Sequence, residues 1–218
     1  EQTVSGAFPG LFLTDLLGSR VQNPAAGLLL NPGTIDAAME RLELMALSDG
    51  SFSMWPRGGG TWITGSIYAA HFLAEAIHAG AEVPERLREG TLRFLDDLVA
   101  GRRPEAIHPV DRAYALYVLA IAGAPQPARA MAALADRDLP AIGRVLVAGS
   151  LIRSNRPREG MEALGALTHG GLDAPGEGWG LDSPVRRLGL ALLVQLDANP
   201  TDPAAEVLVR HLLPLRNT

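Results

Sequence analysis

The 218-residue chain contains no cysteine, so no disulfide can form within it. A chain of this length buries roughly 70% of its unfolded surface, which supports a core without such cross-links. No apolar run approaches the ~18 residues of a membrane-spanning helix, so we expect no direct membrane insertion of this domain. Basic residues are outnumbered, at 19 Lys and Arg against 24 Asp and Glu. The formal net charge of −5 disfavours nucleic acid as a partner, because such binding rewards a basic patch.

Short motifs that would indicate enzymatic chemistry are also missing. The sequence has no Gly-x-x-x-x-Gly-Lys-Ser/Thr phosphate loop, no Gly-x-Ser-x-Gly nucleophile elbow and no His-Glu-x-x-His zinc motif. The glycine run at 58–60 is a flexible connector and too short to indicate a phosphate site. We therefore expect no cofactor and no metal.

Regularly placed prolines mark where helices begin. Proline is tolerated in the first helical turn, where its missing N–H costs no hydrogen bond, and Asn31, Ser183 and Asp202 precede such prolines as capping residues. No stretch alternates with a period of two, so we expect almost no sheet. The predicted helices cover residues 4–18, 33–47, 62–79, 84–100, 109–123, 127–136, 139–153, 157–168, 183–197 and 203–214.

These helices are short and closely connected, which predicts stacked helix hairpins. Two longer glycine-rich loops, at 49–60 and 170–180, each place a tryptophan shortly before a helix. Weak internal repeats of this kind are typical of an α/α toroid or an open solenoid. We therefore expect one all-α domain over residues 1–218.

Three separated stretches share a further likeness. The chain opens with Glu-Gln-Thr-Val-Ser-Gly at 1–6, residues 49–55 read Asp-Gly-Ser-Phe-Ser-Met-Trp before a Trp-Ile-Thr start at 62–64, and residues 113–120 read Ala-Tyr-Ala-Leu-Tyr-Val-Leu-Ala. In order and spacing they resemble the thioester domain of bacterial α2-macroglobulin-like proteins, in the α2-macroglobulin and complement family. The opening is similar to the segment directly after the cysteine of the family's Cys-x-Glu-Gln motif.

The resemblance implies a fold and a function. The fold is an α/α toroid of six helix pairs, of which about five would be present here. Gln2 would be the acyl position of a thioester, with Glu1 as its motif neighbour and a cysteine two residues before Glu1. A thiolate is a good leaving group, so an attacking amine or hydroxyl becomes fixed to the Gln2 acyl group.

The implied protein is a broad-spectrum endopeptidase inhibitor, a single-use covalent trap and not an enzyme. Its partners would be the trapped proteases and the other domains of the parent macroglobulin. The implied location is the periplasm or cell envelope, including an inner-membrane lipoprotein parent, with secretion as the alternative.

Four further residues are candidates for a place near the thioester. Some complement proteins use a histidine that attacks the thioester first, and His108 falls in a similar position; its alternative is a solvated histidine at a helix start. Trp55, Trp62 and Tyr68 cluster in sequence and would form an aromatic wall that excludes water. Their alternative role is core packing between helix pairs.

One helix carries a possible set of metal ligands. His71, Glu75 and His78 fall at i, i+4 and i+7 on one face, and three nitrogen or oxygen ligands on one face could in principle bind zinc. The two histidines lie about 10 Å apart along the axis at 1.5 Å per residue. Hydrogen-bonded or exposed polar residues are therefore the alternative that we favour.

Acidic residues leave open a different class of function, an α/α-toroid glycoside hydrolase; a helical interaction scaffold is another alternative. A glycosidase needs two carboxylates roughly 5–10 Å apart. Asp96 and Asp97 are adjacent, so they point to different helix faces. The remaining acidic candidates lie near Trp179 and are Asp173, Glu177 and Asp182. We expect Asp182 to cap the helix begun by Pro184.

Overall fold

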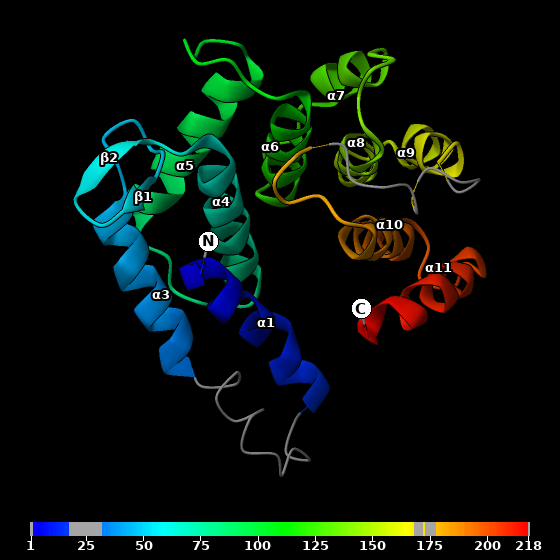
Figure 1. Ribbon diagram of the computed structural model, residues 1–218, viewed down its shortest axis with the longest axis horizontal. Helices are drawn as coiled ribbons and strands as arrows, with labels where there is room; N and C mark the ends of the chain where they lie inside the picture. The colour runs from blue at the N-terminus through cyan, green and yellow to red at the C-terminus, as the bar shows by residue number, and fades with distance from the viewer. Residues whose placement is uncertain (1, 18–31, 168–171, 173–177, 218) are drawn as a thin grey trace. The chain divides into compact units, whose positions relative to one another are not determined.

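The protein is described by a computed structural model over residues 2–17, 32–167, 172 and 178–217. This part of the chain holds ten α-helices, one short 3₁₀-helix and a two-stranded hairpin (Figure 1). The predicted all-α class is therefore confirmed. The chain forms two compact units, Glu1–Ala100 and Gly101–Thr218. The single toroidal domain stays a prediction.

The first unit is a cluster of helices with a small hairpin at one edge. Helix α1 packs against α3 and α4, and α4 packs against α5. Their shared core includes Val4, Leu42, Phe72 and Leu73, all at most 2% exposed. The elements are α1 (Gln2–Leu17), α3 (Pro32–Met45), β1 (Ser53–Trp55), β2 (Gly58–Thr61), α4 (Ile63–His78) and α5 (Glu85–Val99).

The hairpin is the element that we did not predict. Strands β1 and β2 are antiparallel, with Ser53 opposite Thr61 and Trp55 opposite Gly58. Arg57 and Gly59 have positive φ angles of 60° and 94°, which turn the chain between and within the strands. The sequence hides this hairpin because three consecutive glycines in β2 have no side chains that could alternate.

In the second unit the helices gather around α8. Helix α8 packs against α6, α7, α9 and α10, and α10 also packs against α11. Val145, Val147, Ala148 and Leu151 of α8 are completely buried, as expected for a central helix. The elements are α6 (Pro109–Ile121), α7 (Pro127–Leu134), α8 (Ala141–Arg153), α9 (Pro157–Gly165), α10 (Pro184–Ala198), α11 (Ala204–Leu212) and the 3₁₀-helix η2 (Leu213–Asn217).

Proline and capping side chains begin several of these helices, as predicted. Proline occupies the first turn of α6, α7, α9 and α10. The Ser183 hydroxyl accepts a hydrogen bond from the Arg186 N–H at 3.2 Å and so caps α10. Asp202 accepts one from the Ala204 N–H at 2.9 Å, but the capping residue of α11 is Pro203 and not Asp202. Asn31 lies outside the described residues. Within the described ranges, no helix is both long and apolar enough to span a membrane.

Candidate functional site

Gln2 is the first residue of α1, and its side chain is exposed. It lies in an open groove of about 290 Å³ between α1 and α3. Small side chains on both helices leave this space, and Arg41 is the only charged residue among the described residues that line it. The lining comes from Gln2, Thr3 and Gly6 of α1 and from Thr34, Ala37, Ala38 and Arg41 of α3. Glu1 lies outside the described residues.

An aromatic contact holds α1 on α4 near Gln2. The Phe8 ring stacks on the Tyr68 ring, with centroids 5.7 Å apart and an interplanar angle of 9°. The edge contact between Phe8 and His71 has a centroid distance of 5.1 Å. The Ser5 and Tyr68 hydroxyls are hydrogen-bonded at 3.3 Å. Because Ser5 is three residues after Gln2, Tyr68 helps to fix the helical turn that carries Gln2.

The two tryptophans of the first unit have different environments. Trp62 is half-buried at the start of α4, and its backbone N–H donates to the Phe52 carbonyl at 3.0 Å. Its ring covers Gly65, where an added Cβ would lie 2.1 Å from Trp62 Cε3. Trp55 in β1 is 68% exposed. Trp62 is thus packed against its own helix, whereas Trp55 is open to solvent; a wall around a thioester stays a prediction for both.

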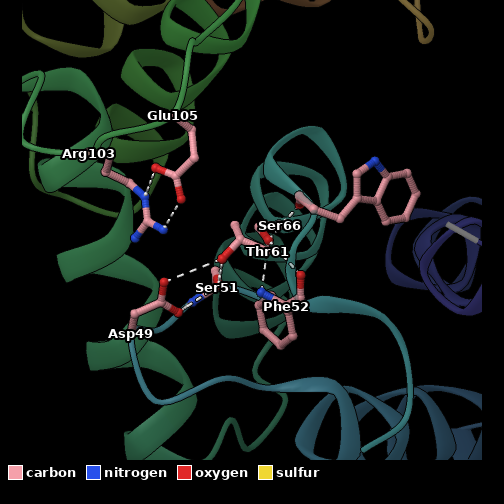
Figure 2. A network of polar contacts seen from close by, with 8 residues as sticks. Asp49, Ser51, Phe52, Thr61, Ser66, Arg103 and Glu105 are labelled. Atoms are coloured by element: carbon pink, nitrogen blue, oxygen red, sulfur yellow. Dashed lines mark hydrogen bonds and ion pairs between the residues drawn. The ribbon is translucent and has the colours of Figure 1, made fainter. Parts of the chain in front are cut away.

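A polar network ties the 49–52 turn to the hairpin and to α4, as Figure 2 shows. One Asp49 carboxylate oxygen accepts from the Ser51 N–H at 3.0 Å and from the Ser51 hydroxyl at 2.6 Å. The Ser51 and Thr61 hydroxyls are 2.9 Å apart. The Ser66 hydroxyl of α4 accepts from the Phe52 N–H at 2.8 Å. The Asp-x-Ser spacing is typical of an Asx turn, so the sequence itself carries a signal for this turn.

His108, in the second unit, caps α6. Its Nδ1 accepts a hydrogen bond from the Val110 N–H at 3.2 Å, and the residue is exposed. This contact accounts for its place directly before Pro109. Because His108 and Gln2 belong to different units, a role for His108 beside Gln2 stays a prediction.

The proposed ligand set on α4 forms ion-pair contacts along the helix. His71 Nε2 is 3.6 Å from one Glu75 oxygen, and His78 Nδ1 is 3.7 Å from the other. His71 is buried at 7% exposure, while His78 is exposed. Among the described residues, no group of three or more His, Asp or Glu is arranged to hold a metal ion.

Asp182 does not cap α10, contrary to our prediction. Ser183 is the capping residue, because its hydroxyl reaches the Arg186 N–H. Asp182 instead pairs with Arg187, with 3.4 Å between Asp182 Oδ1 and Arg187 Nε and side chains 2% and 1% exposed. Both side chains are thus enclosed in this ion pair, and the Asp182 carboxylate is not open to a substrate.

Among the described residues, the other acidic candidates form no pair of facing carboxylates of the kind that a glycosidase needs. Asp96 and Asp97 are consecutive, half-buried residues near the end of α5. Successive residues of a helix project about 100° apart around its axis, so these two carboxylates leave the helix in different directions. Asp173 and Glu177 lie outside the described residues.

A buried hydrogen bond that we did not predict anchors Trp179. Its indole N–H donates to Asp111 Oδ1 at 3.0 Å, and its ring meets Tyr114 edge-on at 5.9 Å. Asp111 lies in the first turn of α6, where the positive end of the helix dipole favours a carboxylate. An aspartate in a first turn is so often exposed that the sequence carries no signal of this burial.

The two units together define an all-α protein built from packed helix hairpins. The same fold occurs within bacterial α2-macroglobulins, which confirms the predicted resemblance at the level of fold. The chain aligns with Salmonella α2-macroglobulin reacted with methylamine at a TM-score of 0.79 and 21% identity, covering 99% of this chain and 15% of that one. It aligns with Escherichia coli α2-macroglobulin activated by porcine elastase at 0.78 and 21%, covering 97% and 20%.

A third structure spans native Escherichia coli α2-macroglobulin from domain MG7 to the C-terminus. It aligns at a TM-score of 0.75 and 20% identity, with 97% of this chain and 35% of that chain covered. The chain thus spans at most about a third of the length of these macroglobulins. No family model and no curated protein matches the sequence. At this level of identity, the likeness establishes the fold alone.

Proposed function

We propose that this chain is the thioester-bearing domain of a bacterial α2-macroglobulin-like endopeptidase inhibitor. Gln2 supplies the acyl group, and its partner is a cysteine two residues before Glu1 in the parent protein. The observation that carries the proposal is the exposed side chain of Gln2 in the first turn of α1, in a fold found within bacterial α2-macroglobulins. One of those structures is of a protein reacted with methylamine, a small amine nucleophile.

The surroundings of Gln2 suit an acyl group that an external nucleophile attacks. The groove leaves one side of Gln2 open, while the Phe8 contacts fix α1 against α4. In the reaction, a neutral amine forms a bond to the Gln2 acyl carbon, and the bond from that carbon to sulfur breaks. The departing thiolate takes up the proton that the amine loses. The product amide is stable, so each molecule reacts once and does not turn over.

The biological partners follow from this chemistry. A protease surface offers lysine amines, which can attack the acyl group when the parent protein brings the two together. Two of the similar Escherichia coli structures are of protein activated by porcine elastase and by trypsin. We extend this to the present chain as a trap for endopeptidases that works in the periplasm or cell envelope.

Thiol release from the intact parent protein tests the proposal. With methylamine, we expect one free thiol to appear and the protein to gain the full mass of one methylamine, because the proton that the amine loses stays on the thiol. The Gln2→Ala variant should release no thiol on methylamine treatment. The matched control is Gln126→Ala at the start of α7, which should react as the wild type does. An unreactive wild type, or unchanged thiol release from Gln2→Ala, would contradict the proposed function.

A further inference from the structure

We propose that the groove between α1 and α3 is the binding site for the acyl acceptor, and that Arg41 makes it favour acceptors with a carboxylate near the nucleophilic amine. The covalent part of this inference rests on the proposed function of Gln2. The binding part does not, because the groove and Arg41 are present whether or not a thioester forms.

The Gln2 side chain and the positive charge of Arg41 lie in the same groove. Gln2 of α1 and Arg41 of α3 line the same groove of about 290 Å³. One water needs only roughly 10–15 Å³ of such space, so a small organic molecule fits. Thr34, Ala38 and Arg41 follow an i, i+4, i+7 spacing, which places them on one face of α3. Arg41 therefore faces the groove through the packing of the two helices.

The charge of the groove has one sign among the residues described. The other described lining residues are neutral. Helix α3 also carries three exposed acidic residues, Asp36, Glu40 and Glu43, and none of them lines the groove. An incoming carboxylate thus meets a guanidinium, which can bind it through two parallel hydrogen bonds. An ammonium group meets the same positive charge and is disfavoured.

The covalent step is the same aminolysis as in the proposed function, with the acceptor held by Arg41. The acceptor's carboxylate rests on Arg41 while its neutral amine forms the bond to the Gln2 acyl carbon. The bond from that carbon to sulfur breaks, and the thiolate gains the proton from the amine. An exposed ion pair of this kind corresponds to a preference of about two- to fivefold for an acceptor with a carboxylate over one without it, and salt weakens this preference.

Binding to the 218-residue chain is the first test, because it needs no thioester. The probes are N-acetylglycinate, which is anionic, and its neutral methylamide, observed through the side-chain NMR signals of Gln2 and Arg41. We expect the anion to shift the Gln2 amide signals in the wild type and in the control Arg88→Gln on α5. The shift should be lost or strongly reduced in Arg41→Gln. Equal shifts in Arg41→Gln, or equal shifts from the neutral probe, would overturn the inference.

Thiol-release rates in the parent protein are the second test. Glycine and glycinamide differ in their carboxylate, and the ratio of their rates in one variant cancels the protein's intrinsic reactivity. We expect this ratio to fall about two- to fivefold in Arg41→Gln and to stay unchanged in Arg88→Gln. An unchanged ratio refutes the inference while the proposed function stands. If no amine releases a thiol, the proposed function fails, and the NMR titration still decides whether the groove binds carboxylates.

Discussion

The indole ring of Trp62 lies directly against the backbone of Gly65, one turn further along α4. A Cβ at position 65 would sit 2.1 Å from Cε3 of the ring and 2.4 Å from Cδ2. No side chain larger than hydrogen fits beneath the ring in this position. The orientation of Trp62 therefore depends on the absence of a side chain at Gly65.

Gly65→Ala should force the Trp62 ring to move. Overpacking of this kind costs about 1–3 kcal/mol, against a helix-propensity gain of up to about 1 kcal/mol. We expect a net loss of stability in urea unfolding and a changed near-UV circular dichroism signal. Gly189→Ala in α10 is the control, because nothing lies within 4 Å of its added Cβ, and it should stabilise the protein by roughly 0.5–1 kcal/mol. An unaltered near-UV signal in Gly65→Ala would contradict the packing described.

Alanine substitutions at Gly50 and Gly59 distinguish the cost of backbone strain from the cost of a steric clash. Both glycines have positive φ angles, 83° and 94°. At Gly59 the nearest atom to an added Cβ is 3.9 Å away, so Gly59→Ala should cost only the left-handed strain of about 1–2 kcal/mol. At Gly50 the added Cβ would lie 1.9 Å from the Gly90 carbonyl oxygen, so Gly50→Ala should cost at least about 3 kcal/mol. Similar losses in urea unfolding for the two variants would show that the turn is not pressed against α5.

Arg187 should be far more costly to replace alone than together with Asp182. Removing one partner of a buried ion pair leaves an uncompensated charge, at a cost of about 3–5 kcal/mol. We expect this loss for Arg187→Met in denaturant unfolding. The double variant Asp182→Leu with Arg187→Met should recover most of it, because both charges are then gone. A double variant as unstable as the single one would mean that the pair itself is not the source of the loss.

The bond from Trp179 to Asp111 has a fluorescence signature. The chain has three tryptophans, so Trp55→Phe with Trp62→Phe leaves Trp179 as the only indole. In that background, Asp111→Ala should remove the acceptor at a cost of about 1.5–3 kcal/mol and shift the Trp179 emission. Asp111→Asn keeps an acceptor oxygen and should change both less. Identical emission in the Ala and Asn variants would argue against the bond.

Helix positions were largely predictable from the sequence, because proline and capping residues act locally. Ser183 caps the helix that Pro184 begins, as its place in the sequence predicted. The hairpin at 53–61 was not predictable, since glycines in β2 give no alternating pattern. Arg187 and Asp111 were missed for a different reason. Their burial depends on neighbours distant in sequence or on an adjacent loop, and a charged residue in a helix is usually exposed.

The candidate site was predictable only in part. The sequence singled out Gln2 and Tyr68, and the structure relates them through Ser5. It offered no reason to single out Arg41, because one arginine on an amphipathic helix is indistinguishable from a solvated charge. The packing of α1 on α3 is what places Arg41 and Gln2 in the lining of the same groove.

Gly50 and Gly90 are in contact, but the two positions differ in how much room an added Cβ would have. This difference determines which of them can mutate to alanine. A Cβ on Gly90 would lie 3.3 Å from the Gly50 Cα, a distance that a shift of a few tenths of an ångström relieves. A Cβ on Gly50 would meet a carbonyl group of the α5 backbone, which cannot give way without disturbing the helix. In a library selected for folding, alanine should therefore accumulate at position 90 while position 50 remains glycine.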